Sequence, residues 1–208
     1  MTTAVAISAQ EQILDAAEEL FARQGLEPTT IKQIGAAAGQ NPALLYYYFG
    51  SKEELYRAVL RRVVQAMLER GGAALDGAAS PPLAIKALVG AQMEFVLGHP
   101  NAPRLLVREL IDHEARSAQA MLLELAVAVF RRLCGVIEAG QREGHFRGDL
   151  EPRFAAVSTI AQVVYFIIAR PAVGLFFGAG VTEATAREFG KHAGDFAVSA
   201  LQRREQTG

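Results

Sequence analysis

Four helix-start signals fall within the first 54 residues, and they constrain the fold more than any other feature of the sequence. Ser8 and Thr30 each stand three residues before a Glu or Gln, the capping-box spacing in which side chain and backbone satisfy each other. Asn41 precedes Pro42, a favoured pair at a helix start because proline lacks an N–H that would have no partner there. Ser51 marks the fourth start in the same way. The sequence therefore predicts four closely spaced helices, and no run shows the alternation typical of strands.

The turn between the second and third of these helices is very short. Apolar spacing over residues 31–38 stops at Gly39, and only "GQN" separates it from Pro42. A three-residue turn containing glycine forces two helices to cross sharply, which is the spacing of a helix-turn-helix. We expect Leu45 and Phe49, four residues apart, to hold the third helix to the core, with "YYY" (46–48) at its edge and on other faces. Adjacent exposed tyrosines usually contact a partner.

Helical apolar spacing continues through the rest of the chain. We expect an all-α fold of about nine helices, with a small N-terminal unit followed by a larger bundle. The segment "GGAALDGAASPP" after residue 70 is interpreted as a linker or loop, and Pro82 opens the next helix. The later helices are expected at residues 52–70, 83–98, 103–113, 117–143, 152–170 and 182–203.

Composition excludes several classes of protein. Hydrophobic residues make up 51% and charged residues 21%, which is typical of a globular protein in water. The most apolar segment, residues 154–169, is shorter than the roughly 20 residues that a membrane span needs. Cys134 is the only cysteine, so neither an internal disulfide nor a cysteine-based zinc site is possible within the chain. We expect a cytoplasmic protein that does not bind membranes and needs no metal or cofactor.

The residues from 13 to 60 resemble a known family. "ILDAAEELFARQGLEPTTIKQIGAAAGQNPALLYYYFGSKEELYRAVL" is similar to the DNA-binding domain of the TetR family of bacterial transcription regulators. The resemblance implies a DNA-binding domain at residues 8–51 and a helical ligand-binding and dimerisation domain at residues 52–208, connected by the helix at 52–70. "RELIDH" and "AQVVYFIIARPAV" faintly resemble CecR-type ligand domains of the family.

The resemblance also implies which residues meet DNA, with the third helix in the major groove. Phosphates would be contacted from the second helix, by tyrosine hydroxyls and at the start of the fourth helix, and base edges from residues 40–44. A proline after Asn41 and a tyrosine in place of the family's frequent histidine at Tyr48 depart from the pattern and leave the base preferences open. The implied DNA contacts are Thr30, Lys32, Gln40, Asn41, Ala43, Leu44, Tyr47, Tyr48 and Lys52.

The net charge of the N-terminal region does not by itself indicate a nucleic-acid partner. Residues 1–56 carry three basic and seven acidic side chains, a net charge of −4. Four of the acidic residues fall on the first helix, mostly away from its apolar stripe, so they can face away from DNA. Because neutralising few phosphates releases few counterions, we expect a shallow dependence of DNA affinity on salt.

Two apolar helices predict a dimer interface. A helix that is hydrophobic nearly all round must be covered all round, and pairing with a second chain would suit two operator half-sites. A buried helix in a monomer is the alternative, and the family resemblance favours the dimer. The predicted interface residues are Phe154, Val157, Ala161, Val164, Ile168, Phe189 and Phe196.

Polar and aromatic groups within apolar helical stretches are the candidates for a ligand site. The predicted ligand residues are Gln92, Phe95, Arg108, Glu109, Gln162, Tyr165 and Phe166. Glu94, Phe176 and Phe177 are further groups of the same kind. Core packing, or an ion pair for Arg108 and Glu109, is the competing explanation of each. Glu109 and His113 are also spaced to share a metal, although a surface histidine is the favoured interpretation.

We therefore expect a regulator, acting as a repressor, that a small and largely apolar ligand releases from a palindromic double-stranded operator. An all-helical enzyme acting on a hydrophobic substrate is an alternative, but the sequence lacks paired carboxylates at metal spacing, a GxSxG motif and a cysteine dyad. A helical adaptor without DNA binding is a third possibility.

Overall fold

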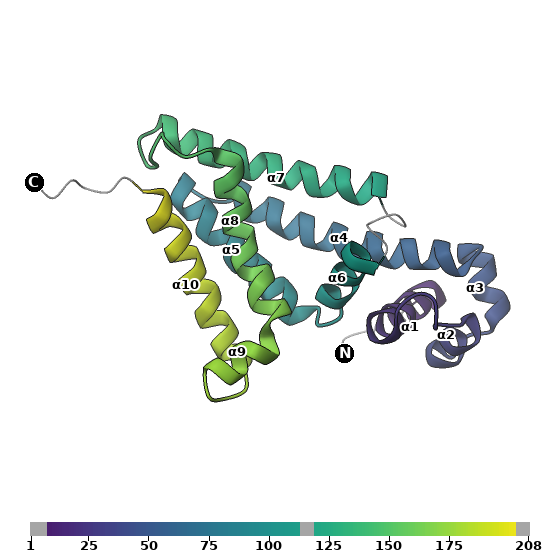
Figure 1. Ribbon diagram of the computed structural model, residues 1–208. Coiled ribbons are helices and arrows are strands. Elements are labelled where there is room, and N and C mark those ends of the chain that lie inside the picture. Colours follow the sequence, from purple (N-terminus) through teal and green to yellow (C-terminus); the bar gives the residue numbers. More distant parts are fainter. Residues whose placement is uncertain (1–7, 113–118, 203–208) are drawn as a thin grey trace, which may run out of the picture. The chain divides into compact units, whose positions relative to one another are not determined.

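The computed structural model describes residues 8–112 and 119–202, and every regular element in those ranges is an α-helix (Figure 1). The all-α prediction is confirmed, with ten helices in the described ranges against about nine expected. They are α1 (Ala9–Gln24), α2 (Ile31–Ala38), α3 (Pro42–Phe49), α4 (Lys52–Asp76), α5 (Pro81–Gly98), α6 (Ala102–Asp112), α7 (Gln119–Arg142), α8 (Pro152–Ile168), α9 (Arg170–Phe176) and α10 (Glu183–Leu201).

The chain divides into two compact units, and the division cuts through α4. The first unit takes residues 1–65 and 100–123, so α6 joins α1, α2, α3 and the first part of α4. The second unit takes residues 66–99 and 124–208, which holds the rest of α4 with α5, α8, α9 and α10 and most of α7. A single helix therefore contributes to both units.

Local signals explain the starts of α1, α2 and α3. Ser8 and Thr30 both form the complete capping box, and the Asn41 side chain caps α3 with Pro42 in its first turn. The chain leaves α2 through Gly39, whose left-handed φ of 65° suits glycine. A Cβ atom on Gly35 would stand 2.8 Å from the carbonyl oxygen of Gln40, so α2 and the turn approach too closely for any other residue.

Helix α4 runs farther than the sequence predicts. We expected it to end before Gly71, but it continues to Asp76. Gly71 and Gly72 are buried inside it, with Leu88 and Arg132 directly beside them. Arg132 donates to the carbonyl of Gly72 at 3.3 Å. Each mid-helix glycine costs about 1 kcal/mol relative to alanine, and tertiary packing offsets that cost. The expected linker shrinks to the residues between α4 and α5.

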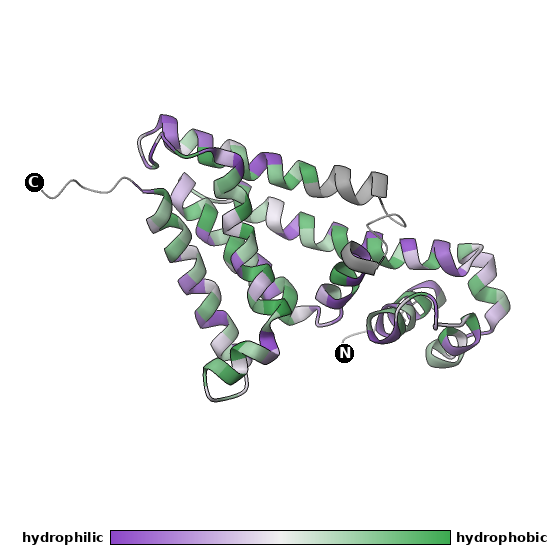
Figure 2. Cartoon of the chain, in the orientation of Figure 1, coloured by the Kyte–Doolittle hydropathy of each residue, from purple (hydrophilic) through white to green (hydrophobic). Residues whose placement is uncertain are grey.

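The second unit is held together chiefly by α5 and α10, which pack along their lengths (Figure 1). Small residues allow this approach, because Cβ atoms on Gly190 and Gly194 would meet Met93 and Lys86 at 3.1 and 3.3 Å. Two clusters of buried apolar side chains extend from this pair to α8, one including Ile85 and the other Val163. Figure 2 shows hydrophobic residues along much of α5, α8 and α10.

The chain bends by 81° after α8, where the expected helix over 152–170 breaks and the short α9 follows. We expected a break in "RPAVGLFFGAG", and the structure instead begins a second helix there with Pro171 in its first turn. No single helix in the described ranges is long and apolar enough to cross a membrane. The bent pair of α8 and α9 passes the same test of length and composition together, which is weak evidence for a span.

Candidate nucleic-acid interface

Helix α3 buries Leu45, leaves Leu44 and Phe49 half-buried, and presents its three tyrosines. Leu45 is 1% exposed and belongs to the core, whereas Tyr47 is 80% exposed. Tyr46 and Tyr48 are also exposed, and the rings of Tyr47 and Tyr48 meet edge to face with centroids 5.3 Å apart. Three neighbouring phenol groups therefore stand on the outside of a helix-turn-helix, where their hydroxyls are available to a polar partner.

The start of α3 is fixed by its own side chains. The Asn41 Oδ1 accepts the Ala43 backbone N–H at 2.9 Å, and the Gln40 Nε2 donates to Gln12 Oε1 on α1 at 2.7 Å. Ala43 is exposed and Leu44 is half-buried beside them. The caps hold residues 40–44 in a defined geometry at one end of the tyrosine face.

The other predicted DNA contacts differ in exposure and in the hydrogen bonds that their side chains make within the protein. Thr30 caps α2 by accepting the Gln33 N–H at 3.2 Å, and its residue remains exposed. Lys32 is exposed on α2. Lys52 is only half-exposed, and its Nζ donates to the carbonyls of Leu26 and Glu27 at 2.9 and 3.2 Å. The structure thus brings eight of the nine candidates to α2, α3 and the turns beside them, and gives Lys52 internal partners.

Two acidic residues of α1 pair with a basic residue of α4 that lies beyond residues 1–56. Arg62 on α4 forms ion pairs of 2.6 Å with Asp15 and with Glu18. Partial burial lowers the pKa of Arg62, but the hydrogen bonds to Glu18 and Asp15 outweigh it and raise that pKa overall. Sequence reasoning missed this residue because 44 and 47 positions separate the partners. Arg62 therefore pairs with two of the acidic residues and offsets one of their two negative charges.

The predicted dimer stripe on α8 lies on the surface of the chain. Phe154 is 75% exposed, and Val157, Ala161, Val164 and Ile168 are also exposed. Phe196 on α10 is exposed too, whereas Phe189 is half-buried with its ring stacked on Phe166 at 4.1 Å. A row of apolar side chains without polar tips is thus uncovered in a single chain.

The candidate ligand residues of the second unit do not form one group. Phe166 is buried in the α8–α10 core, and Tyr165 is 64% exposed on the outer side of α8, three and four residues from Ile168 and Ala161. Phe95 is buried and stacks on His99 at 4.3 Å. Gln162 is half-buried.

Gln92 is the candidate with the clearest polar requirement. Its Oε1 atom is buried and has no hydrogen-bond partner among the described residues. A buried carbonyl oxygen without a donor costs about 1–3 kcal/mol, so the site favours a molecule that supplies an O–H or N–H group. The buried Gln92 amide oxygen could therefore accept a hydrogen bond from a ligand.

Arg108 and Glu109 belong to the first unit, away from the other ligand candidates along the chain. Glu109 is buried and its Oε2 accepts the Tyr56 hydroxyl at 3.1 Å. Arg108 donates to the Arg23 carbonyl at 3.4 Å. His113, the residue considered as a metal partner of Glu109, lies outside the described residues. Within the described ranges no group of three or more metal-ligating side chains is present.

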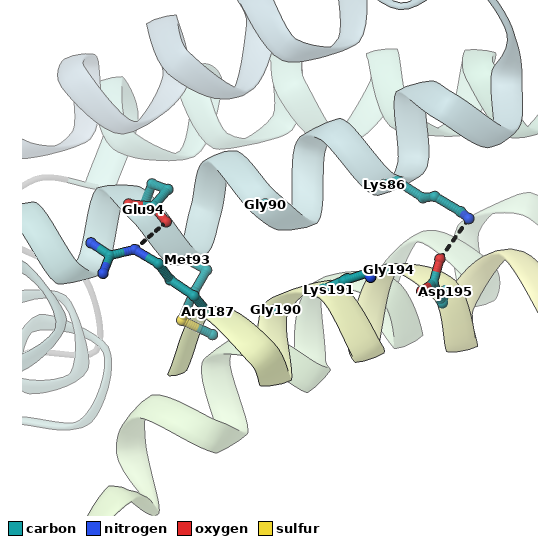
Figure 3. A pocket seen from close by; sticks show the side chains of 9 residues that line it. All are labelled: Lys86, Gly90, Met93, Glu94, Arg187, Gly190, Lys191, Gly194 and Asp195. Carbon is teal, nitrogen blue, oxygen red and sulfur yellow. Dashed lines mark hydrogen bonds and ion pairs between the residues drawn. The ribbon is translucent and has the colours of Figure 1, made fainter. Parts of the chain in front are cut away.

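A groove of about 440 Å³ lies between α5 and α10 (Figure 3). Its floor carries Gly90, Gly190 and Gly194, and ion pairs join Glu94 to Arg187 at 2.9 Å and Lys86 to Asp195 at 2.5 Å on either side. Of the residues considered for a ligand site from the sequence, only Glu94 lines it. The other charged side chains gave no sequence signal, because alternating charges on an exposed helix are ordinary.

Comparisons with known proteins agree with this arrangement. The family model described as "Bacterial regulatory proteins, tetR family" matches residues 13–59, and the one described as "Tetracyclin repressor-like, C-terminal domain" matches residues 81–196. The CecR-type resemblance of the second unit stays a prediction beside that match.

Two relatives show the similarity along most of the chain. The HTH-type transcriptional repressor NicS of Pseudomonas putida is 33% identical over 161 residues, 76% of this chain and 74% of that protein. The HTH-type transcriptional repressor KstR2 of Rhodococcus jostii is 29% identical over 144 residues, 69% of this chain and 71% of that protein.

Solved structures share the fold. The ketosteroid transcriptional regulator KstR2 of Mycobacterium tuberculosis superposes with a TM-score of 0.72 at 23% identity, over 97% of this chain and 98% of that one. A tetR-family regulatory protein from Rhodococcus RHA1 reaches 0.79 at 20% identity, over 96% and 100%. With the helix-turn-helix and its exposed tyrosine face, these matches show that the chain belongs to the tetR family of bacterial regulatory proteins and is a DNA-binding transcription regulator.

Proposed function

We propose that the protein is a repressor that binds a palindromic operator as a homodimer and leaves it when a small, largely apolar ligand binds in the helical bundle. The observation that carries the DNA-binding part is the tyrosine face of α3. Three exposed phenols follow a capped turn on a helix whose opposite side is anchored by Leu45. Since the named relatives are transcriptional repressors, repression is the sign of regulation we infer.

In the proposed complex the N-terminal end of α3 enters the major groove. Gln40 and Asn41 would approach base edges, and Ala43 and Leu44 offer only apolar contact, for example to a thymine methyl. Tyr47 and Tyr48 would donate to phosphate oxygens, with Thr30 and Lys32 holding the backbone from α2. DNA binding would then draw mainly on hydroxyl and amide groups, and the protein would act in the cytoplasm, where bacterial DNA lies.

The proposed homodimer buries the apolar stripe of α8 against its copy. Phe154, Val157, Val164 and Ile168 are too exposed to be left in water over four turns of helix. A two-fold axis would set the stripe against itself and add Phe196 from α10. The two reading helices would then meet half-sites about 34–36 Å apart. The proposed division of labour is DNA binding at residues 8–51 and ligand binding and dimerisation at 52–208.

The proposed ligand is small and largely apolar, with one hydrogen-bond donor. Apolar side chains dominate the second unit, and the buried Gln92 oxygen needs a donor. Two proteins whose structures share this fold are named as a ketosteroid regulator and a fatty acid degradation regulator, and an apolar effector would be in keeping with those names. Ligand binding would favour a state in which α4 moves, and operator affinity would fall by the ligand's differential affinity for the two states.

The test is fluorescence anisotropy of the full chain with a labelled duplex taken from the DNA upstream of its own gene. We expect binding between nanomolar and micromolar protein, competed by the same unlabelled duplex and not by a scrambled one. Absence of binding over that range, with or without cell extract, would contradict the proposal.

A further inference from the structure

The short segment between α1 and α2 is held by one of its own side chains and by groups from two other helices of the first unit. Thr29 is buried, and its hydroxyl donates to the Gly25 carbonyl at 2.6 Å. Lys52, in the first turn of α4, donates to the carbonyls of Leu26 and Glu27 at 2.9 and 3.2 Å. The main-chain carbonyls of this turn therefore bind the ammonium group of Lys52, which comes from α4.

Arg108 approaches the same turn from α6. Its Nη2 donates to the Arg23 carbonyl at 3.4 Å, and a Cβ atom on Gly25 would stand 3.1 Å from its Nη1. The guanidinium thus lies close to Gly25, which has a φ of 87° that favours glycine. A cation at this place also suits the partial negative charge at the C-terminus of α1.

The neighbouring residue anchors α6 to α4. Glu109 is buried and accepts the Tyr56 hydroxyl at 3.1 Å, and the Tyr56 ring meets Phe21 of α1 edge to face at 5.0 Å. Successive residues of α6 therefore contact α1 and α4. These contacts explain why α6 belongs to the first unit although it is distant in sequence from α1–α3.

We propose that Lys52 and Arg108 are positioning residues for operator binding, which clamp the α1–α2 turn from α4 and α6 and so orient α2 and α3 without contacting DNA. Moving Lys52 to a phosphate would remove the donor from two carbonyls, one of them in a partly buried contact. This inference rests on the proposed function.

The salt dependence of operator binding separates a positioning residue from a phosphate contact. We expect Lys52→Met and Arg108→Met each to weaken binding about tenfold, with a slope of log affinity against log salt equal to that of the unchanged protein. The matched control is Lys32→Met, which removes an exposed lysine and should lower the slope by about 1. Lys52→Arg and Arg108→Lys keep the charge and should restore most of the affinity.

A fall in slope of about 1 for Lys52→Met or Arg108→Met, or unchanged affinity, would overturn the proposal. Hydrogen exchange without DNA provides an arm that does not depend on operator binding. The amides of residues 25–34 should exchange faster in Lys52→Met and Arg108→Met than in Lys32→Met, with the rest of α1 unchanged. If the unchanged protein binds no upstream duplex, the proposed function fails, and equal exchange in all three variants would separately reject the clamp.

Discussion

Helices α3 and α8 both leave large side chains uncovered, but the chemistry of the two surfaces differs. Tyr46, Tyr47 and Tyr48 on α3 each end in a hydroxyl, whereas Phe154, Val157, Val164 and Ile168 on α8 end in methyl groups or a bare ring. A polar-tipped aromatic can exchange water for a phosphate oxygen, while a purely apolar row gains only by meeting another apolar row. The chemistry of each exposed surface therefore indicates which kind of partner would cover it: a phosphate backbone for α3 and a second apolar surface for α8.

The largest effect should come from charging the α8 stripe. Val164→Asp places a carboxylate where we propose that two copies of α8 meet, and burying an unpaired charge costs several kcal/mol. We expect the dissociation constant of the dimer to rise more than about 100-fold, measured by analytical ultracentrifugation. Ala128→Asp, at an exposed position of α7, is the control and should leave the dimer intact. Equal dimerisation of the two variants would show that α8 faces water.

Operator affinity should be sensitive to the loss of a single side chain or hydroxyl from the tyrosine face of α3. Tyr47→Ala should weaken operator binding about tenfold or more, and Tyr47→Phe about half as much in free energy, since a hydrogen bond to a charged group contributes about 1.5–3 kcal/mol. Anisotropy titrations at fixed salt give both values.

Tyr165→Phe provides the control for Tyr47→Phe, because it removes the hydroxyl of an exposed tyrosine on α8. It should leave operator affinity unchanged. If the two variants behave alike, the hydroxyls of α3 have no special role and the contrast between the helices is lost.

A third prediction concerns the turn that sets α3 in place. Gly35→Ala puts a Cβ against the Gln40 carbonyl, and we expect it to lower the free energy of unfolding by about 1–3 kcal/mol. Gly135→Ala is the matched change in α7, where nothing lies within 4 Å, and should instead stabilise by about 0.5–1 kcal/mol. Chemical denaturation followed by circular dichroism measures both. A stable Gly35→Ala protein with normal operator affinity would contradict the close approach.

The smallest expected effect is that of salt. With few lysines near α3 and two α1 carboxylates paired to Arg62, few counterions should leave DNA on binding. We expect a slope of log affinity against log salt smaller in magnitude than about 5, so that doubling the salt weakens binding less than about 30-fold. A slope near that of a lysine-rich repressor would show that cations outside the tyrosine face carry the affinity.

The sequence predicted the first unit better than the second, for a physical reason. Each helix start near α3 depends on a cap and a backbone group two or three residues apart, so Ser8, Thr30 and Asn41 could be interpreted locally. The continuation of α4 through Gly71 and Gly72 depends on Leu88 and Arg132, which are distant in sequence.

The candidate site shows the same limit. The exposure of Tyr47 and Tyr48 followed from helical geometry once Leu45 was placed inside. The partners of Lys52 lie 25 and 26 residues away, and a lysine at a helix start gives no sign of them. Nothing in the sequence around Arg108 predicts its contact with the Arg23 carbonyl at the end of α1. Side chains that bind a distant backbone group are the ones whose partners the sequence alone does not predict.

Hydrogen exchange of the full chain, with and without its upstream duplex, tests the contrast between α3 and α8 most directly. We predict that DNA slows exchange in residues 40–49, while residues 154–168 are protected equally in both states because they are already covered by the second copy. Unchanged exchange in 40–49 on saturating DNA, or protection of 154–168 that appears only with DNA, would contradict the account.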